Sequence, residues 1–125
     1  GRVGTGDQRL IAGVVINGTT PKRVLIRAVG PTLSSLGVNG SLADPNLRLI
    51  RQDTGLTVRE NDDWERGNDA NLVTDVAAQV GAFALPSGSK DAALLITLPP
   101  GVYTAIVGTA SGSSGIALVE VYEVP

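Results

Sequence analysis

Short apolar segments separated by turn residues constrain the fold of this chain more than any other feature. Three such runs, at residues 10–16, 23–29 and 92–98, are rich in Val, Ile and Leu and stop at Gly, Pro or Asn-Gly. Runs of this kind are typical of β-strands, and runs that are apolar at successive positions predict strands buried on both faces. The pattern predicts an all-β antiparallel sandwich, jelly-roll-like or immunoglobulin-like, formed by residues 1–125 as a single domain.

Two further pairs of segments are predicted to be strands. Residues 46–50 and 56–59 are joined by an Asp-Thr-Gly turn. Residues 102–107 and 116–124 are β-branched and apolar, and the loop between them is rich in Gly and Ser. Because short loops of this composition join neighbouring strands, we expect the second pair to form a hairpin.

One segment has the periodicity of a helix. Its apolar residues recur on one face of a helical wheel, at Leu72, Val73, Val76, Ala77 and Val80. Asn68 or Asp69 can cap the N-terminus, and Gly81 stands where a glycine commonly ends a helix. We predict one short helix at residues 69–80, packed over one end or edge of the sandwich.

Composition and charge argue against several classes of function. The chain has no His and no Cys, which removes the usual general base and the best nucleophile, so we do not expect an enzyme. The net charge is −2 and the basic residues are scattered, which does not suit a nucleic-acid partner. No apolar run approaches the roughly 20 residues that span a bilayer, so membrane insertion is not expected.

An acidic turn is the best candidate for a metal site. Asn61, Asp62 and Asp63 could supply oxygen ligands to calcium, the only cofactor that the sequence suggests. The alternative is an Asx turn whose side chains bond the local backbone, with Trp64 capping the core. Both interpretations remain open.

Arg27 lies inside an apolar strand, where an unpaired charge is costly to bury. Either that face of the strand is exposed, or Arg27 pairs with a carboxylate such as Asp44 or Asp63. We favour the ion pair, in a structural role. Arg51 stands beside a polar turn and is expected to be solvated.

Several stretches together resemble a repeat domain of unknown function found in large secreted and surface proteins of Verrucomicrobia and related bacteria. The resemblance rests on residues 3–7, 10–13, 21–31, 42–45, 61–64, 98–105 and 115–122. The second half, from Asn-Asp-Asp at 61–63 to Pro-Gly-Val-Tyr at 100–103, is also similar to the bacterial pre-peptidase C-terminal domain. These resemblances imply a sandwich and an extracellular or cell-surface location. Some pre-peptidase C-terminal domains bind calcium or collagen.

The function expected from these observations is a non-catalytic structural, assembly or adhesion module. Strands near both chain ends, carrying Val3, Val121 and Val124, are expected to pair with identical copies or with flanking domains of the same protein, building filaments or arrays. The alternative is an accessory domain of a secreted hydrolase that binds a glycan or a surface protein.

Overall fold

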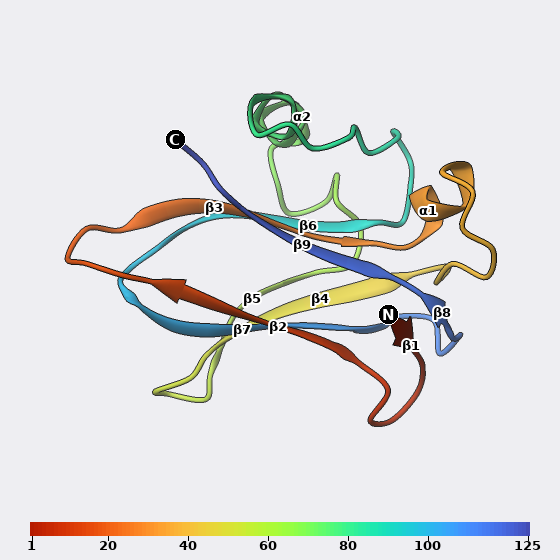
Figure 1. The fold of residues 1–125 in the computed structure, drawn as a ribbon, viewed down its shortest axis with the longest axis horizontal. Helices are drawn as coiled ribbons and strands as arrows, with labels where there is room; N and C mark the ends of the chain where they lie inside the picture. The colour runs from red at the N-terminus through yellow and green to blue at the C-terminus, as the bar shows by residue number, and fades with distance from the viewer.

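The protein is an antiparallel β-sandwich in the computed structural model, which describes residues 1–125 (Figure 1). The four-stranded sheet has the order β2 (Leu10–Ile16), β7 (Gly101–Thr109), β4 (Pro45–Arg51), β5 (Thr57–Asn61). The three-stranded sheet has the order β6 (Ala92–Leu98), β3 (Lys22–Val29), β9 (Leu118–Glu123). At one end of the sandwich, β1 (Arg2–Val3) pairs with β8 (Gly115–Ile116). The predicted sandwich is therefore confirmed.

The main core lies between the two sheets and is almost entirely aliphatic. Leu47 and Leu49 of β4 are fully buried against Ile26 of β3, and Tyr103 is the only aromatic residue in this cluster. Alternate residues of each strand point inward, as the two-residue repeat of a strand requires. Burial of these aliphatic side chains is the main source of stability.

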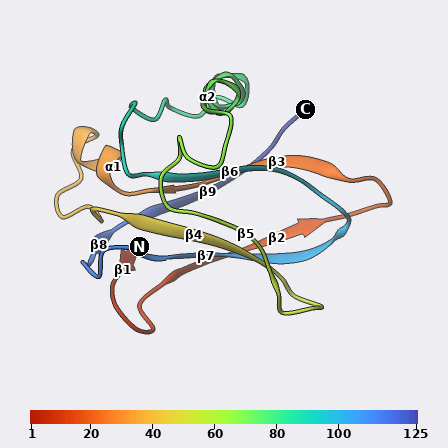
Figure 2. The ribbon, with the colours of Figure 1, turned by 180° about the vertical axis from the view of Figure 1, so that it is seen from behind.

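A second layer covers the outer face of the three-stranded sheet. Helix α2 (Ala70–Gln79) lies over this face and buries Val73 and Val76 in the same cluster as Leu25 and Trp64 (Figure 2). The side chain of Asp69 accepts a hydrogen bond from the Leu72 amide at 3.2 Å, which caps the helix as the sequence predicts. Neither helix of the protein is long and apolar enough to cross a bilayer.

The outer face of the four-stranded sheet has no such cover (Figure 1). Ile11 and Val15 of β2 are 67% and 59% exposed, and Val102, the partner of Val15 on β7, is 45% exposed. The prediction that residues 10–16 form a strand buried on both faces is therefore wrong, because β2 is an edge strand with one solvated face. By contrast, β3 is central to its sheet and buried along most of its length.

Pairing of the strands differs from the sequence prediction at the C-terminal end. The expected hairpin of residues 102–107 and 116–124 does not form, because β7 and β9 belong to different sheets. The connection between them crosses the end of the sandwich, where β8 pairs with β1. The strands predicted at residues 46–50 and 56–59 correspond to β4 and β5, which form an antiparallel ladder with an irregularity between Leu49 and Ile50.

A second helix was not predicted. Helix α1 (Pro31–Ser35) follows β3 directly and has Pro at its start. Its five residues are too few for a helical period to be visible in the sequence. The pair Gly30-Pro31 therefore predicts only the end of the preceding strand.

Candidate functional site

Arg27 is buried and paired, as the sequence suggests, but with a different partner. Its side chain is fully buried, and its Nε and Nη2 both lie 2.9 Å from Oε1 of Glu120. Glu120 stands directly opposite Arg27 in the β3–β9 ladder. The guanidinium group also donates to the Phe83 carbonyl oxygen and lies 4.4 Å from the centre of the Phe83 ring. The predicted partners Asp44 and Asp63 are wrong, because they lie in loops outside this ladder.

Arg51 is not the solvated residue that the sequence predicts. Its side chain is 29% exposed and pairs with Asp53 at 2.9 Å. It also donates to the Tyr103 hydroxyl at 3.0 Å and packs against Gly101, where a Cβ atom would meet the guanidinium group. Although Arg51 stands beside a polar turn in the sequence, its side chain folds back over the first residues of β7.

The acidic turn is organised by hydrogen bonds to the backbone. The Asn61 amide donates to the Arg66 carbonyl at 2.6 Å and accepts from the Ala93 amide at 3.1 Å. Trp64 is buried in the second cluster, and its indole N–H donates to the Pro86 carbonyl at 3.0 Å, so its predicted place in the core is confirmed. No group of three or more acidic side chains is arranged to hold a metal ion. The geometry around Asn61 matches the turn interpretation, and calcium binding by Asp62 and Asp63 stays a prediction.

Asp44 lies near this turn and carries a perturbed carboxyl group. Burial raises the pKa of Asp44 above its ordinary value of 3.8, and the charges of Asp62 and Asp63 raise it further, against an opposing effect of Lys90. Its Oδ1 atom is buried without a hydrogen-bond partner. The folded state therefore holds the proton of Asp44 more tightly than the unfolded chain does, and ionisation of Asp44 costs stability.

We expect the variant Asp44→Asn to be more stable than the wild-type protein near neutral pH. A raised pKa in the folded state adds stability below the ordinary value, and this contribution is lost as the pH rises through the raised pKa. The difference between the two proteins should therefore shrink as the pH falls toward about 4. Urea unfolding midpoints measured at both ends of this range test the prediction. The control is Asp75→Asn, at an exposed position on α2. Equal changes of the unfolding midpoint for Asp44→Asn and Asp75→Asn would contradict the prediction.

Asp91 is a key structural residue that the sequence does not reveal. Its carboxylate is fully buried and accepts four hydrogen bonds: from the Gly30 amide, from the amide and hydroxyl groups of Thr32, and from the Ser89 hydroxyl. These contacts bind the start of α1 to the start of β6. Because Gly30 and Asp91 are 61 residues apart, no local pattern could have predicted the contact.

The structure changes the role expected for two of the three terminal valines. Val3 is fully buried in the main core, and the first residues pair with their own chain through two hydrogen bonds between Gly1 and Ala117, both 2.9 Å. Val124 is also buried, in the cluster under α2. Neither side chain is available to a partner, so the predicted contact through them is wrong. Val121 is 40% exposed on the edge strand β9.

Val121 lines a groove on one flank of the sandwich. Strands β2 and β9 are the edges of different sheets and lie next to each other on this flank without pairing. The groove between them measures about 300 Å³, and its walls include Val14 and Ile16 of β2 and Val24 of β3. Lys22 and Glu123, which form an exposed ion pair at 2.8 Å, stand at the same flank. We call this region the open flank.

Fold and site together define an antiparallel β-sandwich with one helix-covered face, one bare face and one open flank. No protein-family model matches the chain, and neither does any curated protein or any solved structure. The resemblances to the repeat domain and to the pre-peptidase C-terminal domain therefore stay predictions.

Proposed function

We propose that this domain is a non-catalytic assembly or adhesion module of an extracellular or cell-surface protein, which associates through its open flank with identical copies or with flanking domains. The observation that carries the proposal is the unprotected edge of β9. Unpaired backbone groups along an exposed strand edge accept a further strand, and natural proteins that avoid this guard the edge.

The backbone of β9 has groups free for such a strand. Val124 donates its amide hydrogen to the Arg23 carbonyl of β3 at 2.9 Å. Because residues of an antiparallel pair alternate in the direction of their amide groups, the N–H groups of Val119, Val121 and Glu123 point away from β3. The open flank therefore offers a row of donors and acceptors beside the groove.

The charges on β9 guard this edge less than the sequence suggests. Glu120 is turned onto the helix-covered face, where it pairs with Arg27 and accepts a hydrogen bond from the Tyr122 hydroxyl at 2.6 Å. Only Glu123 remains at the edge, and Lys22 compensates its charge. The β3–β9 register runs without a bulge. Two common means of blocking edge-to-edge pairing are therefore missing from this strand.

We expect Val121→Lys to weaken self-association at least tenfold, because pairing would bury an uncompensated charge in the groove. Val121→Pro should have a similar effect, because it removes an outward N–H group without breaking the bonds to β3. Sedimentation of the intact chain over a range of concentrations measures both effects.

Val102→Lys is the matched control. Val102 has a similar exposure, 45%, but lies on the interior strand β7, which has no free edge. If Val102→Lys abolished association while both Val121 variants left it intact, the contact would be the bare sheet face and the edge proposal would be wrong. A wild-type chain that stays monomeric, alone and joined to its neighbouring domains, would also overturn it.

A further inference from the structure

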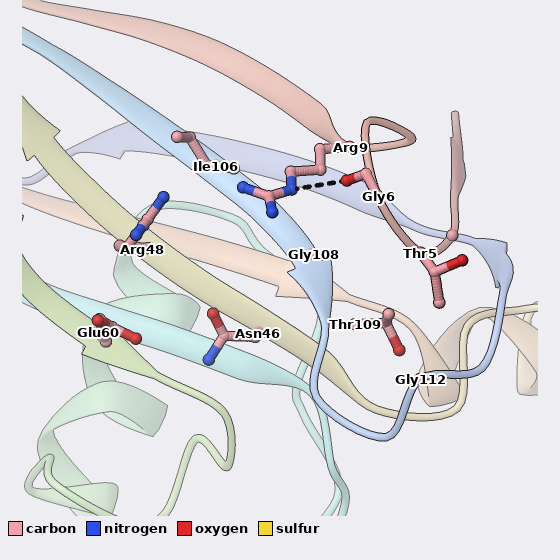
Figure 3. A pocket seen from close by; sticks show the side chains of 11 residues that line it. Thr5, Gly6, Arg9, Asn46, Arg48, Glu60, Ile106, Gly108, Thr109 and Gly112 are labelled. Carbon is pink, nitrogen blue, oxygen red and sulfur yellow. Dashed lines mark hydrogen bonds between the residues drawn. The ribbon is translucent and has the colours of Figure 1, made fainter.

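A second surface feature, a polar pocket, lies on the bare face of the four-stranded sheet. It measures about 360 Å³ and is bounded by the loop that precedes β2, by strands β7, β4 and β5, and by the connection after β7 (Figure 3). The loop is held in place by a bond from the Gly4 amide to the Gln8 carbonyl at 2.8 Å, and Gly6 adopts a positive φ of 71°. The pocket is separate from the open flank.

Two arginine side chains give the pocket a positive charge. Arg9 is anchored by one hydrogen bond, from its Nε to the Gly6 carbonyl at 3.2 Å, and extends across β7 toward Arg48 (Figure 3). Arg48 forms no ion pair, although Glu60 stands opposite it in the β4–β5 ladder. Most of the guanidinium donors of both residues are therefore free. Paired guanidinium groups suit a carboxylate or another planar anion.

Other polar groups in the pocket are also without partners in the chain. The side chains of Asn46 and Glu60 line the site from β4 and β5 and form no hydrogen bonds to protein atoms (Figure 3). An amide both donates and accepts hydrogen bonds, and a carboxylate accepts them. Such groups are suited to hydroxyl groups placed beside the anion that the arginines hold.

Gly108 forms part of the pocket wall, and nothing in the chain requires a glycine there. A Cβ atom at this position would meet no atom within 4 Å, and φ lies outside the left-handed region. Glycine inside a strand reduces stability and often marks a site where a ligand approaches the backbone. The missing side chain keeps the pocket open beside Arg48 and Asn46.

We propose that this pocket binds a hexuronate, a sugar unit whose carboxylate pairs with Arg9 and Arg48 while its hydroxyls bond to Asn46 and Glu60. The volume is at the lower end of small-ligand sites, about 300–1,000 Å³, which suits one such unit. Ile106 is the only apolar residue in the lining, and no aromatic ring is present for stacking a neutral sugar. A peptide of Asp or Glu would satisfy the arginines, but its side chains carry no hydroxyl group to donate to Glu60.

To test this inference, the isotope-labelled protein is titrated with D-galacturonate and the chemical shifts of its backbone amides are recorded by NMR. We expect saturable shifts at Gly6, Arg48 and Gly108, and none with D-galactose, which lacks the carboxylate. Arg48→Ala should weaken binding at least tenfold, since it removes charge-assisted hydrogen bonds. Arg59→Ala, an exposed arginine on β5 outside the pocket, should leave binding unchanged. Tighter binding of trigalacturonate than of D-galacturonate would indicate a site for a polymer, and equal binding a site for a single sugar. Binding of either probe supports the proposal.

Gly108→Val separates binding from folding. The new side chain should fill the pocket and abolish binding, while the melting temperature stays equal to that of the wild type or rises. Gly13→Val is the matched control, because Gly13 is another outward-facing strand glycine with open space at its Cβ position and lies outside this pocket. Absence of saturable shifts with both uronate probes would overturn the proposal. So would equal affinity for sulfate or galactose, or binding of triglutamate in place of the uronates.

Discussion

Replacing Arg27 with alanine is expected to reduce the free energy of unfolding by about 3–5 kcal/mol, a large part of the stability of a small domain. The guanidinium group is fully buried and is the only cation paired with Glu120, whose own side chain is 15% exposed. Its removal leaves a largely buried carboxylate without a cation, with only the Tyr122 hydroxyl as a donor, and leaves the Phe83 carbonyl without its donor. The position of the urea unfolding midpoint measures the loss.

Two controls make this result specific. Arg59→Ala removes an exposed arginine that forms no ion pair, and should change stability by less than about 1 kcal/mol. The double variant Arg27→Met with Glu120→Leu replaces both charges with apolar side chains, and should recover much of the loss caused by Arg27→Met alone. Equal midpoints for Arg27→Ala and Arg59→Ala would show that the ion pair contributes nothing to stability.

The positions of the strands along the chain could be predicted from the sequence, because they depend on local patterns. The segments at residues 10–16 and 92–98 match β2 and β6 residue for residue, since apolar runs and turn residues mark their ends. Helix α2 was equally visible, because Asp69 caps a clear apolar stripe. In each case the determining residues are neighbours in the chain.

Pairing of the strands could not be predicted in the same way. Most successive strands alternate between the two sheets, and only β4 and β5 form a ladder with their neighbour in sequence. The partner of Arg27 depends on the β3–β9 register, 93 residues apart, so Asp44 and Asp63 were as reasonable as Glu120. Burial of Val3 likewise depends on the pairing of β1 with β8, which lies at the other end of the sequence.

The candidate sites show this limit most clearly. The polar pocket brings Arg9, Arg48 and Gly108 together from three separate segments, none of which carries a motif. The open flank exists only because β2 and β9 end two different sheets on the same side. Composition predicts a non-catalytic domain from residue types, but the candidate binding surfaces are products of topology.

Asp91→Ala should lower the melting temperature by about 10 °C or more, which corresponds to roughly 3 kcal/mol in a domain of this size. Four donors converge on the buried carboxylate, and alanine would leave the amides of Gly30 and Thr32 without an acceptor. A Cβ atom at Gly30 would collide with the Leu42 carbonyl, so the loops beside this carboxylate are tightly packed.

Asp91→Asn provides a graded test of the same contact. It keeps one acceptor oxygen but turns an NH₂ group toward donors, so its melting temperature should fall between those of the wild type and Asp91→Ala. Asp75→Ala, at an exposed carboxylate on α2, should change stability by no more than about 0.5 kcal/mol. Hydrogen exchange should accelerate first at the Thr32 amide, because α1 loses the group that bonds its first turn. A melting temperature for Asp91→Ala equal to that of Asp75→Ala would mean that α1 is held by the packing of Leu33 and Leu42 rather than by this carboxylate.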